Sequence, residues 1–142
     1  MEKDIMGKIA IWAFIIGTLI ALIVGIYQAN SLHESGGLID SFLATDTGGW
    51  VAWLLVVLGG IVGVLAILGK GTITKQEVPG FLMAGVALLI TYGVFGSTIP
   101  TIYLHPYLGA LLIGVSESLA LFIVPSVSLL ALKAVWDIGK NV

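Results

Sequence analysis

The sequence contains no cysteine and no arginine among its 142 residues. Without cysteine the chain cannot form a disulfide, a thiolate metal site or a cysteine nucleophile. Without arginine it lacks the side chain that holds phosphate or carboxylate groups through two parallel hydrogen bonds. These two absences exclude enzymes and metal sites that depend on cysteine, and proteins that bind anions through arginine.

Charged residues are scarce as well: they make up 10% of the chain, whereas 58% is hydrophobic. Soluble domains average about 25% charged residues. Six lysines and eight acidic residues are too few to cover the surface of a soluble domain of this size. The composition excludes a soluble enzyme, a nucleic-acid binder with a basic face and a disordered tail. It predicts an integral membrane protein that has the lipid bilayer as a partner.

Long uncharged stretches predict four membrane-spanning helices within a single domain, residues 1–142. The stretches cover residues 9–33, 47–69 and 78–116. A spanning helix needs about 20 mainly apolar residues. The third stretch is too long for one helix and contains prolines, which cannot donate to a helix. The predicted helices cover about residues 9–28, 50–69, 80–97 and 107–136.

The predicted fold class is therefore an all-α integral membrane four-helix bundle, with two further features. The fourth helix is longer than the hydrocarbon core is thick and contains Pro125. This predicts a kink near residues 120–122, or two half-helices. In the loop after the first helix, apolar residues recur at helical spacing over residues 38–43, which predicts a short interfacial helix on the outer surface.

The lysines all fall on one side of this four-helix arrangement. They precede the first predicted helix, connect the second to the third, and follow the core of the fourth: Lys3, Lys8, Lys70, Lys75, Lys133 and Lys140. Short loops rich in lysine face the cytoplasm. The pattern predicts a multi-pass protein of the cell membrane with both termini in the cytoplasm.

Small residues recur at four-residue spacing in three of the predicted helices. Such stripes allow two helix backbones to approach closely in lipid. The first helix carries Ala13, Gly17, Ala21, Gly25 and Ala29; the second carries Gly59 and Gly63; the fourth carries Ala110, Gly114 and Ser118. We interpret them as packing faces, within one chain or between chains. The alternative is that glycine is simply common in membrane helices.

One acidic residue, Glu117, lies inside a predicted helix. It is about ten residues into the fourth helix, roughly 15 Å along its axis and near mid-bilayer. It shares a helical face with Gly114 and Ser118, which predicts that it points inward. Ser116 and Ser118 could supply hydroxyl groups beside it. An acidic side chain at this depth is costly and is a candidate functional residue.

Three interpretations of Glu117 remain open at this point. The first is a proton or cation site, between helices or on the axis of an oligomer. The second is a protonated side chain that holds helices together by bonding to Thr18, Thr91 or a backbone carbonyl. The third is a shift of the helix that brings Glu117 to a membrane interface.

Metal and cofactor chemistry has little support in the sequence. His33 and His105 could bind zinc or copper, but they come from separate predicted loops and no His-x₃-His spacing occurs. Solvated loop residues are the better interpretation, so we predict no metal site and no cofactor. The chain also lacks a P-loop, a Gly-x-Ser-x-Gly elbow, an HExxH motif and an EF-hand, so we assign no catalytic residue.

The second half of the chain carries short motifs in a definite order. They are Glu77-Val78-Pro79, Ile99-Pro100, Phe122-Ile123-Val124-Pro125 and Ala131-Leu132-Lys133. Residues 75–136 thereby resemble a group of small, uncharacterised archaeal multi-pass membrane proteins. The resemblance implies a multi-pass fold in an archaeal cell membrane and no catalytic residue.

The sequence leaves three functional hypotheses. The first is a non-enzymatic structural or accessory subunit of a homo-oligomer or a larger membrane complex. The second is an oligomeric proton or cation channel or transporter that uses Glu117. The third is an accessory subunit of a membrane metalloenzyme, with His33 and His105 near the metal. None involves nucleic acid.

Overall fold

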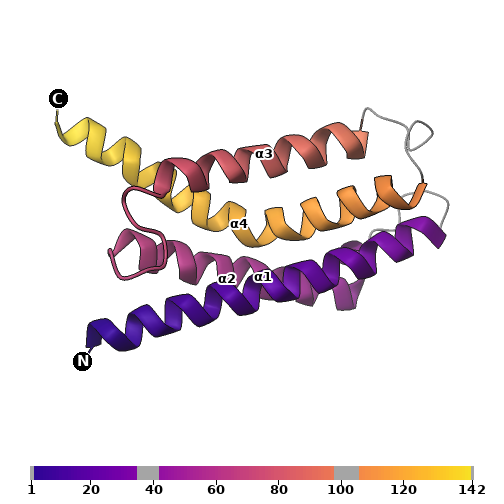
Figure 1. Ribbon diagram of the computed structural model, residues 1–142, viewed down its shortest axis with the longest axis horizontal. Coiled ribbons are helices and arrows are strands. Elements are labelled where there is room, and N and C mark those ends of the chain that lie inside the picture. The colour runs from indigo at the N-terminus through magenta and orange to yellow at the C-terminus, as the bar shows by residue number, and fades with distance from the viewer. Residues whose placement is uncertain (1, 35–41, 98–105, 142) are drawn as a thin grey trace.

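The computed structural model describes residues 2–34, 42–97 and 106–141, and these residues contain no β-strand. Four long helices lie alongside one another in Figure 1. They are α1 (Glu2–Glu34), α2 (Asp46–Ile67), α3 (Val78–Ser97) and α4 (Pro106–Lys140), with a short 3-10 helix, η1 (Phe42–Ala44), before α2. Each long helix has a segment long and apolar enough to cross a membrane. This confirms the predicted all-α, four-helix architecture.

Helix α4 is the centre of the bundle. It packs against α1, α2 and α3, and α1 also packs against α2. Helix α3 packs mainly against α4, and only 6% of its most apolar segment is buried. Both ends of the described chain lie at the same end of the bundle, together with the connection between α2 and α3 (Figure 1).

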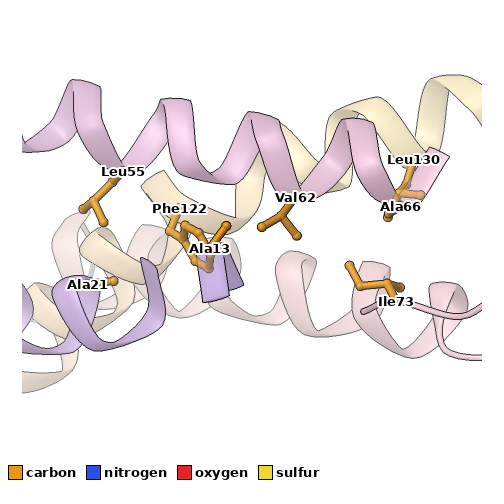
Figure 2. Packing of buried hydrophobic residues seen from close by; sticks show 8 residues of the cluster. All are labelled: Ala13, Ala21, Leu55, Val62, Ala66, Ile73, Phe122 and Leu130. Atoms are coloured by element: carbon orange, nitrogen blue, oxygen red, sulfur yellow. The ribbon is translucent and has the colours of Figure 1, made fainter. Parts of the chain in front are cut away.

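The core follows the line where α1, α2 and α4 meet. Figure 2 shows Leu55 and Val62 pointing from α2 into the bundle, near Phe122 of α4. The Phe122 ring is almost completely buried, and its centroid lies 5.9 Å from that of Phe14. The apolar core continues toward the termini as far as Leu130. Close side-chain packing, rather than exclusion of water, holds such a core together in lipid.

Helix α1 extends beyond the predicted range of residues 9–28 at both ends, reaching Glu2 and Glu34. The predicted range covered only the apolar segment, which is the part of the helix that can contact lipid. A helix itself continues until a residue disfavours it, and the Gly36-Gly37 pair is the first strong breaker after Tyr27. Gln28 therefore lies within α1, six residues before its end.

Two finer predictions concern α4 and the outer loop. Helix α4 is continuous from Pro106 to Lys140 with Pro125 inside it, so it is not divided into two half-helices. The kink near residues 120–122 stays a prediction. The predicted interfacial helix over residues 38–43 falls mostly outside the described residues, and the described part is η1.

The end of α2 is fixed by a glycine turn and by a lysine from α4. Gly69 has a φ of 70°, and its amide donates to the Ala66 carbonyl while the Lys70 amide donates to the Leu65 carbonyl. These two bonds form a Schellman motif, which satisfies carbonyl groups at a helix C-terminus. The Lys133 ammonium group donates to the Ile67 carbonyl at 2.7 Å, so a positive charge also lies at the negative end of the helix dipole.

The start of α3 is fixed by the Glu77 side chain, which forms one half of a capping box with Thr74. The Thr74 amide donates to the Glu77 carboxylate at 2.9 Å, and the Glu77 and Val78 amides donate to the Thr74 carbonyl. The hydrogen bonds from Thr74 lower the pKa of the Glu77 carboxyl below its usual value. The capping bond is therefore fully present above the ordinary pKa of glutamate and is lost as the pH falls through the lowered pKa.

Replacing Gly69 with alanine should destabilise the protein by about 1 kcal/mol, because a Cβ atom disfavours a left-handed backbone. Gly80→Ala is the matched control: neither glycine has a neighbour within 4 Å of an added Cβ, but only Gly69 of the two has a positive φ. Thermal unfolding in mild detergent measures both. Equal melting temperatures for the two variants would contradict the assigned turn.

Candidate functional site

Glu117 connects three helices through its carboxyl group. The Gln28 side-chain amide, on α1, donates a hydrogen bond to Glu117 on α4. The Tyr92 hydroxyl, on α3, is hydrogen-bonded to the same carboxyl group. Gln28 is completely buried, whereas the Tyr92 side chain remains 37% exposed. Glu117 thus has one neighbour in the interior of the bundle and one at its surface.

On the Tyr92 side, Glu117 lines an open cleft of about 430 Å³ between α2, α3 and α4. The other lining residues are apolar: Val56, Leu89, Ala120, Leu121, Val124 and Pro125. Pro125 cannot supply the amide that would normally bond to the Leu121 carbonyl, so this wall of the cleft also loses an intrahelical hydrogen bond. The cleft therefore exposes one carboxyl group and one phenol on a surface that is otherwise apolar.

The cluster of Gln28, Tyr92 and Glu117 does not lie halfway along the bundle. About 24 Å of α4 separates Glu117 from Lys133, at 1.5 Å per residue. Tyr92 lies three residues before the end of the apolar segment Val78–Phe95. The cluster therefore lies in the half of the bundle away from the lysines. The position of Glu117 near mid-bilayer, which was counted from Tyr107, stays a prediction, because the apolar segment of α4 covers 34 residues and is longer than the hydrocarbon core is thick.

Near Glu117, two completely buried polar groups lack a hydrogen-bond partner among the described residues. They are the Gln28 side-chain oxygen and the Ser118 hydroxyl. Ser118 lies on α4 between Gly114 and Phe122, both of which meet α1. Ser116 is buried too, with 5% of its surface exposed, and it lies one turn before Ala120 of the cleft.

The two threonines suggested as partners of Glu117 in one of the three interpretations donate their hydroxyl groups elsewhere. The Thr18 hydroxyl donates to the Phe14 carbonyl, and the Thr91 hydroxyl donates to the Ala87 carbonyl. Both threonines thus bond back to the preceding turn of their own helix, a common arrangement for this side chain. The carboxyl group bonds instead to Gln28 and Tyr92, each of which lies near the end of its own apolar segment.

Sequence reasoning missed Gln28 and Tyr92. Gln28 stands at the end of the predicted helix of residues 9–28, and Tyr92 lies within the predicted helix of residues 80–97, but neither was singled out as a site residue. One signal could have found Gln28: it lies seven residues after Ala21 of the small-residue stripe, and so on the same helical face. Tyr92 carries no comparable signal, since its role depends on how α3 packs.

The predicted small-residue stripes lie at the contacts of α4 with α1 and α2. All five members of the α1 stripe are buried, as are Gly59, Gly63, Ala110 and Gly114. A Cβ atom added to Gly25 would lie 2.7 Å from the Val115 Cα, and one added to Gly63 would lie 2.8 Å from the Ser126 Cα. These backbones approach so closely that a side chain would not fit. The contacts are within one chain.

The histidines do not form a metal site in the part of the chain that is described. No group of three His, Cys, Asp or Glu residues that could hold a metal occurs among the described residues. His33 lies in the last turn of α1, and His105 lies outside the described residues. The described structure therefore adds nothing in favour of the metalloenzyme hypothesis.

No protein-family model, no curated protein and no solved structure matches this chain. The resemblance of residues 75–136 to small archaeal membrane proteins therefore stays a prediction.

Proposed function

We propose that this chain is a non-enzymatic, multi-pass subunit of the cell membrane that acts in a homo-oligomer or a larger membrane complex. The two termini and the six lysines would face the cytoplasm. In support, the start of α1, the end of α4 and the α2–α3 connection all lie at the same end of the bundle (Figure 1). Lysine-rich ends of membrane proteins face the cytoplasm.

The observation that carries the proposal is the cleft beside Glu117. Apolar surfaces elsewhere on the bundle can contact lipid directly and need no protein partner. A carboxyl group and a phenol at a lipid-facing surface are different, because polar groups exposed to hydrocarbon are costly. A helix from a neighbouring subunit, packed into the cleft, would shield both groups and cover part of α3.

Native mass measurement after extraction in nanodiscs tests the proposal. We expect a particle that contains several copies of the 14.9 kDa chain or this chain with other subunits. A strictly monomeric particle without companions would contradict it.

A pair of neighbouring valines offers a matched test of the surface used. Val56 and Val57 are each 40% exposed, but Val56 lines the cleft with Glu117 whereas Val57 lies beside Trp50 and Trp53. Val56→Trp should fill the cleft and reduce the assembled fraction at least about fivefold, a change of roughly 1 kcal/mol. Val57→Trp should leave it unchanged. If both variants assemble like the wild type, the cleft is not the contact surface.

A second candidate function is a proton or cation pathway that uses Glu117. It is favoured by the position of the carboxyl group, which reaches the buried Gln28 on one side and the open cleft on the other. Within the described part of one chain, the core beyond Phe122 is mainly apolar, so such a pathway would run along the cleft, between subunits.

A flux assay in liposomes tests this second candidate. Wild-type protein should carry protons or a monovalent cation, and Glu117→Gln should abolish the flux, because glutamine keeps the size and hydrogen bonding of the side chain but cannot ionise. Equal flux in both proteins, or none in either, would exclude the pathway.

A further inference from the structure

We propose that Gln28, Glu117 and Ser118 form a binding site for one sodium-like monovalent cation at the contact between α1 and α4. The inference deepens the second candidate function, since it names the ligand at Glu117. Binding does not require transport, and the two can be measured separately.

The first argument is the orientation of the Gln28 side chain. Its nitrogen donates to Glu117, so its oxygen is left as a completely buried acceptor without a partner among the described residues. A buried amide oxygen without a partner costs about 1–3 kcal/mol. A cation beside Glu117 would satisfy this oxygen and leave the existing hydrogen bond intact.

The second argument is the position of Ser118. Its buried hydroxyl also lacks a hydrogen-bond partner in the described part of the chain, and Ser118 follows Glu117 directly. A Cβ atom added to Gly114, one turn earlier, would lie 3.0 Å from the Ala29 nitrogen on α1. One turn later, Phe122 contacts Gly17 of α1. Ser118 therefore lies on the α1-facing side of α4, between these two contacts.

The third argument concerns ligand type and charge. Amide, carboxylate and hydroxyl oxygens are the ligands that hard cations prefer. Glu117 is the acidic member of this set. The lysines lie in the N-terminal part of α1, the α2–α3 connection and the C-terminal part of α4, which meet at the other end of the bundle (Figure 1). One monovalent cation would neutralise one carboxylate. A divalent ion would leave a net positive charge among apolar side chains, which is costly.

The cleft supplies a route to this site. It reaches Glu117 from the side opposite Gln28, so the carboxyl group separates the buried oxygens from the open surface. In this proposal, an ion enters from the cleft past the Glu117 side chain.

Equilibrium binding of radioactive sodium to the purified protein in detergent tests the proposal, at one pH and at constant ionic strength with choline as the replacement ion. We expect one sodium per chain and a higher melting temperature in sodium than in choline. Ser118→Ala should weaken binding about tenfold through the loss of one ligand, and Glu117→Gln should abolish it.

Ser116→Ala is the matched control, because Ser116 is buried beside Glu117 but on another face of α4; it should bind sodium like the wild type. No bound sodium in the wild type would overturn the proposal, whether or not any variant folds. Equal losses in Ser116→Ala and Ser118→Ala would overturn the ligand set. Sodium binding without flux in liposomes would support the site and contradict only the pathway.

Discussion

Replacing Gly59 with alanine should lower the melting temperature by about 10 °C. A Cβ atom at Gly59 would collide with the Phe122 carbonyl oxygen and lie 2.9 Å from the carbonyl carbon. Because these are backbone atoms, no side chain can turn aside to relieve the collision, and α2 and α4 must separate. Overpacking of this kind costs about 3 kcal/mol, which corresponds to roughly 10 °C for a chain of this size.

The adjacent glycine supplies the control for this prediction. An added Cβ atom at Gly60 has no neighbour within 4 Å, so Gly60→Ala should be neutral or slightly stabilising, as expected for alanine within a helix. The fraction that stays monodisperse on size exclusion after heating measures both variants. A Gly60→Ala protein as unstable as Gly59→Ala would mean that α2 faces α4 through a different surface.

The Gly59 contact also shows how much of the fold could be predicted from sequence. Glycines at residues 59 and 63 indicated a packing face on the second helix, and hydropathy indicated four spanning segments. Neither could identify the partner, because spacing describes one helix at a time. That α4 lies against all three other helices depends on how the faces match in three dimensions.

The candidate site was less predictable than the fold. Glu117 was found because an acidic residue within an apolar helix is rare. Its partners come from residues 25 and 89 positions away in the chain, and each lies near the end of its own apolar segment, where polar residues are ordinary. Only the packing of α1 and α3 on α4 brings them together, so no local pattern could distinguish Gln28 or Tyr92 from other residues at helix ends.

Gly17→Ala should destabilise the protein nearly as much as Gly59→Ala. In this case, however, a second substitution should relieve the destabilisation. A Cβ atom at Gly17 would meet the Phe122 ring, with its Cζ atom at 2.6 Å and its Cδ2 atom at 2.8 Å. The Phe122 side chain is almost completely buried and lies against Phe14, so it has no free space into which it could turn. Overpacking should cost about 2–3 kcal/mol.

A smaller side chain at residue 122 should relieve this collision and not the one at Gly59. Phe122→Leu alone should destabilise the bundle by leaving a cavity, yet the Gly17→Ala/Phe122→Leu protein should be more stable than the sum of the two single changes by about 1–3 kcal/mol. Gly59→Ala/Phe122→Leu should show no such gain, because the Phe122 carbonyl remains in place. Melting temperatures of the five variants complete both cycles. Equal coupling in the two cycles would contradict the division of contacts in which Gly17 faces the ring of Phe122 and Gly59 faces its backbone.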